Sequence, residues 1–295
     1  MRLEKLLSLT HGNSVYWSAF SPQGDQLATA SLDNTVRLWS LPDGKHVYTL
    51  KGHGDGVAFV DYLPDGRIVT ASLDRTLKIW MADGSKATTT FSGHQEVYLS
   101  CAALCKGTGM GASGGFDRTV RLWETNTGES VAVLSGHEAT VQCVAFNRSG
   151  TVLASGGDDL SVRLWNVETR APIKSLAGHT LAVEGVAFAP DDSLLASAGA
   201  DGSVRLWTLD GAAVATLETP GARLKSVVFA PNGRWLATGA ADGAVRVWDF
   251  TARSLVLTLS AHSNTVYGVA FSSDGQLFAS SGFDRTIHVW KVLDV

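Results

Sequence analysis

Residues Gly136–Trp165, GHEATVQCVAFNRSGTVLASGGDDLSVRLW, contain the unit from which the whole chain is built. After a glycine and a histidine, two apolar segments follow, Val141–Phe146 and Thr151–Ser155, separated by a turn of Asn, Arg, Ser and Gly. A tight Asp-Asp turn then leads into a third segment, Ser161–Trp165. These short segments alternate apolar and polar residues between turn residues, a pattern typical of β-strands.

The same unit recurs along the entire sequence. A tryptophan closes each copy, at successive spacings of 41, 43, 42, 42, 41 and 42 residues: Trp39, Trp80, Trp123, Trp165, Trp207, Trp248 and Trp290. An aspartate stands six residues before every one of these tryptophans, and a Ser or Thr stands four residues before the aspartate. A histidine opens six of the seven units, and Pro220 takes its place in the sixth. A regular period of this length indicates a repeat architecture.

Together these motifs resemble the WD40-repeat family, over essentially all 295 residues. The resemblance implies an all-β fold, a seven-bladed β-propeller with four antiparallel strands per blade around a central channel. Only Trp248 is followed by aspartate, so the dipeptide that names the family is mostly absent. Because the repeats leave no room for a linker, we expect residues 1–295 to form a single propeller domain.

The two ends of the sequence complement each other. Residues 3–9 match the segments that precede later histidines, such as His46–Leu50 and Leu255–Leu259, and residues 291–295 directly follow the third segment of unit seven. We therefore expect the N-terminal strand to join the last blade. This pairing would close the ring and make a complete propeller without open sheet edges.

Composition narrows the classes of function. A net charge of −4 gives no overall attraction to nucleic acid or to a membrane surface. The sequence has no apolar run long enough to span a membrane and no secretory signal at its start. The three cysteines have no metal-ligand spacing and are interpreted as free buried thiols in a reducing compartment. We expect a cytoplasmic, monomeric propeller without a cofactor or metal.

Histidine, serine and aspartate in one protein can indicate hydrolytic catalysis, but a catalytic triad is one activated site rather than a repeated set. The WD40 resemblance instead implies a structural tetrad within each blade. In unit four, Trp165 would donate to Ser155, Ser155 would bond His137, and His137 would bond Asp159. A satisfied network of this kind rigidifies a blade. The sixth unit lacks its histidine, so we expect it to be the softest blade.

Positions that differ between units are the candidates for partner binding. In the family, peptide contacts come largely from the residues beside the first apolar residue of each unit and from the residue before the turn aspartate. All lie on the face carrying the loops that open the units, here called the top face. Mapped onto this sequence, the candidates are Tyr16, Leu32, Leu73, Tyr98, Phe116, Gln142, Asp158, Glu184, Arg223, Lys225, Tyr267 and Phe283.

These candidates are distributed unevenly. The apolar ones belong to units seven, one, two and three, which are contiguous in a closed ring, and the polar ones belong to units four to six. Grouped exposed aromatics predict a partner surface, because aromatic anchors dominate binding energy. The resemblance therefore implies a non-catalytic scaffold that binds a protein or peptide on the top face. In unit three the register is open, because His94 lies one residue further from its first segment than in other units.

Three alternatives are weighed against this scaffold. A propeller enzyme would need a lone acid–base or metal cluster, and Asp158 and Glu184 are the only carboxylates mapped near the channel mouth, with no nucleophile beside them. A histone-tail reader would hold a cation among Tyr16, Tyr267 and Phe283. A nucleic-acid binder would use the basic residue found two positions before six of the seven tryptophans. We interpret that residue instead as part of the repeated strand pattern.

Overall fold

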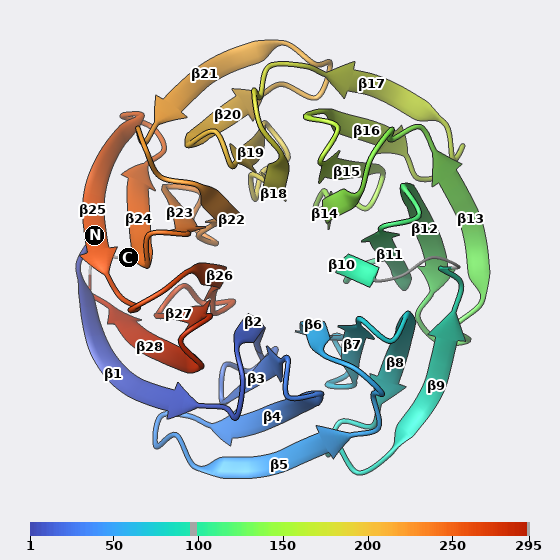
Figure 1. Ribbon diagram of the computed structural model, residues 1–295, viewed down its shortest axis with the longest axis vertical. Coiled ribbons are helices and arrows are strands. Elements are labelled where there is room, and N and C mark those ends of the chain that lie inside the picture. The colour runs from blue at the N-terminus through green and yellow to red at the C-terminus, as the bar shows by residue number, and fades with distance from the viewer. Residues whose placement is uncertain (95–98, 294–295) are drawn as a thin grey trace.

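The structure is a computed structural model that describes residues 1–94 and 99–293. Its described residues form 28 β-strands in seven four-stranded sheets arranged as blades around a central channel, as Figure 1 shows. Consecutive strands within each sheet are antiparallel. The predicted all-β, seven-bladed propeller is confirmed.

The strands follow one another with short connections. In chain order they are β1 (Leu3–Thr10), β2 (Val15–Phe20), β3 (Gln26–Ser31), β4 (Thr35–Ser40), β5 (His46–Lys51), β6 (Val57–Tyr62), β7 (Ile68–Ser72), β8 (Thr76–Trp80), β9 (Ala87–Ser92), β10 (Leu99–Cys105), β11 (Met110–Gly115), β12 (Thr119–Glu124), β13 (Ser130–Ser135), β14 (Val141–Phe146), β15 (Val152–Gly157), β16 (Val162–Asn166), β17 (Pro172–Leu176), β18 (Val183–Phe188), β19 (Leu195–Gly199), β20 (Ser203–Trp207), β21 (Ala213–Glu218), β22 (Leu224–Phe229), β23 (Trp235–Ala240), β24 (Ala244–Asp249), β25 (Ser254–Ser260), β26 (Val266–Phe271), β27 (Leu277–Gly282) and β28 (Thr286–Val292).

Each blade runs from the channel outward. Blade one has the order β2-β3-β4-β5, with β2 at the channel and β5 at the rim, and the next five blades repeat this order (Figure 1). The seventh blade has the order β1-β28-β27-β26, so its rim strand comes from the other end of the chain. Leu3 pairs with Val292 and Thr10 with Thr286 in an antiparallel register. The predicted closure by the N-terminal strand is therefore confirmed.

The hydrophobic core lies between adjacent blades. One cluster joins Val120, Leu122 and Leu134 of blade three to Val141 and other residues of blade four, and equivalent clusters fill the other interfaces. The cluster at the closure unites residues of β1, β2, β27 and β28, so the last interface is packed like the rest. Each blade is thus held on both faces by its neighbours. Within the described residues, no helix is long and apolar enough to cross a membrane.

Candidate functional site

The repeated residues form a network inside each blade that fixes the turns of the top face. In blade four, Trp165 Nε1 donates to Ser155 Oγ over 2.8 Å. His137 Nε2 lies 2.7 Å from the same Oγ, and His137 Nδ1 lies 2.8 Å from Asp159 Oδ2. A carboxylate can only accept, so Nδ1 carries the proton and Nε2 accepts from the serine. These are the hydrogen bonds that the resemblance implied for this unit.

Burial sets the charge state of this network. Loss of solvent lowers the pKa of His137 below its usual value, which outweighs the opposing effect of the carboxylate. Burial alone would raise the pKa of Asp159, but hydrogen bonds from Glu138 N–H and the Ser161 hydroxyl outweigh burial and hold it below its usual value. At neutral pH the network therefore contains a neutral histidine and an ionised aspartate. It is a set of structural bonds rather than an activated nucleophile.

The network is complete in four blades of the described chain and incomplete in three. Blades one, two, four and five each have the tryptophan-to-hydroxyl bond, at 2.8 to 2.9 Å. In the part of the chain that the structure describes, the indole N–H has no acceptor in the other three blades: Trp123, Trp248 and Trp290. In blade six Thr238 Oγ1 is also without a partner there, and Asp242 pairs with Arg246 instead of a histidine.

In blade three a glycine explains why the indole leaves the network. Gly111 stands opposite Trp123 in the β11–β12 pairing, where blade four has Leu153 opposite Trp165. A Cβ atom at Gly111 would lie only 2.3 Å from the Trp123 ring, so the indole occupies the space of the missing side chain. Ser113 keeps its bond to His94 at 2.9 Å without the tryptophan. A glycine two residues from the tetrad serine therefore decides the tryptophan's orientation.

A β-bulge in every first strand aims one side chain at the channel mouth. In β2 the pairing shifts between Val15 and Trp17, which leaves Tyr16 as the extra residue. The same shift occurs in the six other first strands and makes the equivalent residues Ala58, Ser100, Gln142, Glu184, Lys225 and Tyr267. Bulges often redirect a side chain next to a functional site. Seven residues of different chemistry therefore meet at one opening.

Three of the predicted aromatic residues form one cluster at this mouth. The rings of Tyr16 and Tyr267 stack with centroids 4.2 Å apart and planes 13° from parallel. The ring centroid of Phe283 lies 6.3 Å from that of Tyr267, and Phe283 is 46% exposed. Burial, and then the neighbouring Tyr16, raise the pKa of Tyr267 above its usual value, so the phenol stays neutral. The cluster is an uncharged aromatic surface.

This stacking bears on the histone-tail alternative. A cation must lie over the face of an aromatic ring to be attracted by it. The Tyr16 and Tyr267 faces that oppose each other are in contact, so no cation fits between them. A cage closed between these two rings is therefore excluded by their geometry.

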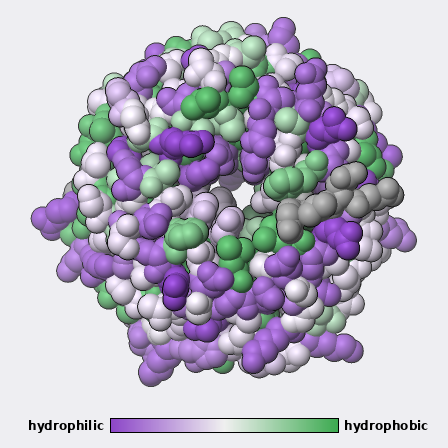
Figure 2. Space-filling view, in the orientation of Figure 1, coloured by the Kyte–Doolittle hydropathy of each residue, from purple (hydrophilic) through white to green (hydrophobic). Residues whose placement is uncertain are grey.

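The predicted aliphatic residues extend the apolar surface to blade two. A Cβ atom at Gly56 would lie 2.4 Å from a Leu32 methyl and 3.3 Å from a Leu73 methyl, so the two leucines meet over this bare glycine. Phe116 lies on blade three and is 47% exposed. We call the six residues Phe283, Tyr267, Tyr16, Leu32, Leu73 and Phe116 the apolar arc. Figure 2 shows the top face, with apolar side chains beside the channel mouth over β2 and β6.

The predicted polar residues pair with one another on the other blades. Gln142 Nε2 lies 3.1 Å from both carboxylate oxygens of Asp158. Glu184 and Lys225 form an ion pair of 2.5 Å between β18 and β22. Arg223 is exposed beside them. Both carboxylates that an enzyme would need at this mouth are thus engaged by a neighbouring side chain.

In blade three the structure settles the open register. Leu99 is the buried first residue of β10, so the bulge residue equivalent to Tyr16 is Ser100, which sequence reasoning missed. The signal was the extra residue between His94 and this strand. Tyr98 lies outside the described residues.

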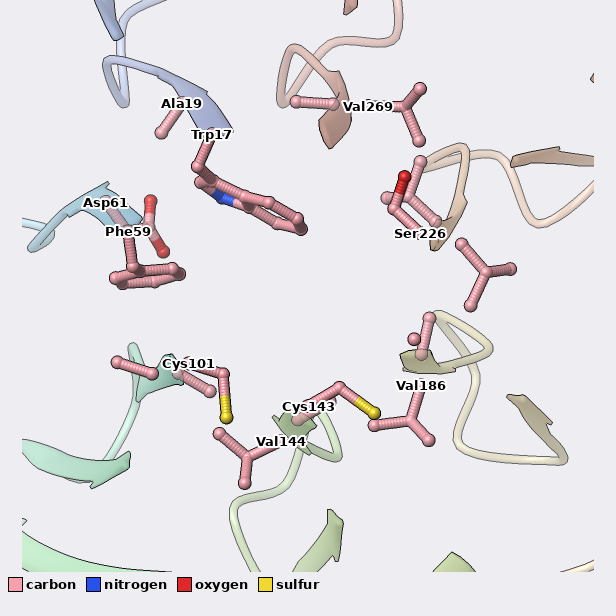
Figure 3. A pocket seen from close by; sticks show the side chains of 18 of the residues that line it. Trp17, Ala19, Phe59, Asp61, Cys101, Cys143, Val144, Val186, Ser226 and Val269 are labelled. Atoms are coloured by element: carbon pink, nitrogen blue, oxygen red, sulfur yellow. The ribbon is translucent and has the colours of Figure 1, made fainter. Parts of the chain in front are cut away.

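Below the mouth, the channel holds a cavity of about 680 Å³. In blades one to six the residue after each bulge lines this cavity, and its chemistry changes around the ring: Trp17, Phe59, Cys101, Cys143, Gly185 and Ser226. Figure 3 shows Trp17 and Phe59 projecting from β2 and β6. It also shows the thiols of Cys101 and Cys143, which belong to β10 and β14. Burial raises the pKa of Cys101 to about 12, so this thiol is not a nucleophile at neutral pH.

Metal binding and phosphate binding have little support in the described chain. No group of three or more His, Cys, Asp or Glu side chains there is placed to hold a metal ion. The basic residues before the tryptophans mostly lie against their own blades: Arg37 is 3.7 Å from Asp33, and Arg121 is 3.6 Å from Asp117. In blade seven His288 replaces them, and its Nδ1 is 3.1 Å from Ser8 Oγ of the closing strand. These residues are not arranged as a phosphate-binding ring.

Comparisons with known proteins agree with the blades seen here. The family described as "WD domain, G-beta repeat" matches residues 3–40, 44–81, 85–124 and 253–291, and "IFT122 first beta-propeller" matches residues 106–256. Ribosome assembly protein 4 of Saccharomyces cerevisiae is 37% identical over 60 residues, which is 20% of this chain and 12% of that protein. Human WD repeat-containing protein 86 is 43% identical over 49 residues, or 17% of this chain and 13% of that protein.

A third relative, coatomer subunit beta'-2 of Oryza sativa subsp. japonica, is 42% identical over 57 residues, which is 19% of this chain and 6% of that protein. The matched segments span at most 13% of the length of these relatives. The two family matches are broader, since each covers just over half of the chain and the repeats they describe coincide with the blades. On this evidence the chain belongs to the WD40-repeat family of β-propellers.

Proposed function

We propose that this chain is a non-catalytic scaffold that binds a peptide or protein segment on its top face, across the channel mouth. The observation that carries the proposal is the set of seven bulges, which directs non-repeated side chains to one opening. Repeated residues are committed to the fold, whereas these side chains are free to differ. A surface of this kind suits recognition rather than chemistry.

The apolar arc supplies the anchors for such a segment. Phe283 and Phe116 are each nearly half exposed on the top face, at 46% and 47%. Rigid aromatic side chains give large contact area at little entropic cost and are frequent hot spots. Their turns are held by the tetrads, so the surface is formed before a partner arrives.

The comparisons support this class of function. Two of the relatives are described as a ribosome assembly protein and a coatomer subunit, names that refer to multiprotein assemblies. By analogy we propose that this chain is also a scaffold, and that it binds its protein partner as a monomeric propeller. Three free thiols fit the cytoplasmic location predicted from the sequence.

The proposal is tested by affinity capture with wild-type protein and a Tyr16→Ala/Tyr267→Ala/Phe283→Ala variant. A matched control, Val47→Ala/Tyr48→Ala/Val133→Ala, removes exposed apolar side chains of the rim, which are 50%, 41% and 48% exposed. We expect the top-face variant to lose proteins that the wild type and the rim variant both retain. If all three recover the same proteins, the top face is not the binding surface.

A further inference from the structure

We propose that the bound segment is acidic. It would place apolar side chains on the apolar arc and Asp or Glu side chains against four exposed arginines that we call the arginine crescent: Arg75, Arg118, Arg223 and Arg285. This inference rests on the proposed function and names the chemistry of its partner.

Three of these arginines occupy the same position in their blades, directly after the tetrad aspartate. Arg75, Arg118 and Arg285 are in the left-handed region, with φ of 71°, 62° and 69°. Each main-chain N–H donates back across the turn, as from Arg75 to Ser72 O at 3.1 Å. A left-handed residue of this size is uncommon. All three arginines are exposed at these tight turns.

On the other four blades the residue directly after the tetrad aspartate is not basic. Blades five and six have Gly202 and Gly243, where a Cβ atom would lie 2.7 Å and 2.4 Å from main-chain oxygens of the neighbouring loop. Blade four has Leu160 and blade one has Asn34. Arginine at this position is therefore confined to blades seven, two and three, which also carry the apolar arc.

Apolar and basic side chains alternate across one turn. Leu73-Asp74-Arg75, Phe116-Asp117-Arg118 and Phe283-Asp284-Arg285 each place one apolar and one basic residue around the tetrad aspartate. A segment that contacts both would need apolar and acidic side chains at close spacing. Arg223 of blade six extends the basic series next to blade seven.

The positive charge of the arginine crescent is not neutralised by contact with carboxylates of the described chain. Within residues 1–94 and 99–293, the four arginines have neither an ion pair nor a side-chain hydrogen bond, whereas Lys225, Arg121 and Arg246 of the same face pair with carboxylates. The adjacent aspartates do not neutralise them by contact. The Asp74 carboxylate, for example, accepts from His53, Thr76 and the Gly54 N–H and is only 17% exposed.

Blade four carries exposed carboxylates without a crescent arginine, whereas blade two carries one exposed carboxylate of this face, Asp55, together with Arg75. The carboxylates exposed on the same face of blade four are Glu138 and Asp158. An acidic segment would be repelled from that side and attracted toward blades six, seven, two and three, which fixes its orientation on the ring. A nucleic acid has uniform charge and would meet the same acids, and the net charge of −4 gives it no general attraction. We therefore favour an acidic peptide segment over a nucleic acid.

The experiment selects a randomised peptide display library on wild-type protein and sequences the enriched peptides. Enriched peptides are then synthesised with a fluorophore, and their affinity is measured by anisotropy at low and high salt. Two charge-neutral triple variants are compared: Arg75→Gln/Arg118→Gln/Arg285→Gln, and the bottom-face control Lys86→Gln/Arg170→Gln/Arg253→Gln. Arg170 and Arg253 are also exposed left-handed residues, so the control matches both the charge lost and the backbone.

We expect the enriched peptides to combine Asp or Glu with large apolar residues. Their affinity should fall about fivefold or more in the crescent variant, as three exposed charge pairs would give, and not in the control. Their affinity in the wild type should also fall with salt. Peptides that depend on Tyr16 and Tyr267 without any excess of acids would overturn this inference and leave the proposed function standing. No enrichment would overturn both this inference and the proposed function. So would binding that neither the arginine variant nor the Tyr16→Ala/Tyr267→Ala/Phe283→Ala variant weakens. Crescent-dependent binding of single-stranded RNA with no acidic peptide enriched would show that the ligand is a nucleic acid.

Discussion

The contribution of the tetrad hydrogen bond can be measured by comparing two tryptophans of this chain. Trp165 and Trp123 occupy the same blade position, and each is only 1% exposed. Trp165 donates to Ser155 over 2.8 Å, whereas Trp123 has no acceptor among the described residues. Replacing each by phenylalanine removes the N–H and a similar amount of ring. The two variants therefore differ in the hydrogen bond and in the space that each indole fills, opposite Gly111 for Trp123 and opposite Leu153 for Trp165.

The magnitudes follow from the two environments. Trp165→Phe loses a buried hydrogen bond, worth about 1 kcal/mol, in addition to the packing lost with the larger ring. Trp123→Phe removes a buried donor without a partner, which relieves about 1–3 kcal/mol, but it also empties space over Gly111, which costs about 1 kcal/mol more packing than at Trp165. Trp165→Phe should therefore destabilise the protein by about 2 kcal/mol more than Trp123→Phe. For a chain of this length, that is a difference of about 3 °C in melting temperature.

Urea unfolding and thermal melting of both variants beside wild type provide the test. Circular dichroism should show the same strand content in all three proteins before unfolding. Equal destabilisation by the two substitutions would mean that the indole-to-hydroxyl bond adds nothing beyond packing. The reasoning would be refuted more strongly if Trp123→Phe were the more damaging change.

Three further outcomes are expected. Trp165→Ala should cost about 3–5 kcal/mol through lost packing and the broken network, and an unchanged melting midpoint would contradict this. Residues 220–250, the blade without a tetrad histidine, should show the fastest amide hydrogen exchange of the seven blades, and uniformly slow exchange there would refute the idea. Burial, His262 and Lys5 lower the pKa of His288 from 6.5 to about 4. Between these values the unfolded chain binds more protons, so stability falls as pH falls; His288→Gln should reduce this loss in melts across that range.

Sequence reasoning predicted the blades well because the period and the tetrad spacing depend only on local strand lengths. It also located the closing strand, since Leu3–Thr10 shares the pattern of the other rim strands. It missed Ser100, because one extra residue before β10 can be absorbed on either side of the strand start. Only pairing with β11 decides which residue becomes the bulge.

The orientation of the tetrad side chains could not be predicted from the sequence, for a different reason. Trp123 keeps the spacing of its counterparts, yet it turns into the space left by Gly111 on the facing strand. Likewise, the sequence placed Tyr16 and Tyr267 on one face, but the stacking that excludes a cation between them depends on how two blades meet. The first feature depends on a contact between facing strands of one blade and the second on a contact between blades, and neither can be predicted from the pattern along a single strand.

The tetrad and the partner surface share the same turns, and this sharing explains how recognition can vary while the fold does not. Asp74 directs its carboxylate inward to His53 and to main-chain N–H groups, while Leu73 and Arg75 on either side of it face the top surface. A substitution at Leu73 or Arg75 leaves every bond of the carboxylate in place, so it should alter binding with little change in stability. A substitution at Asp74 removes the anchor that positions both neighbours, so its effect on binding should always accompany a loss of stability.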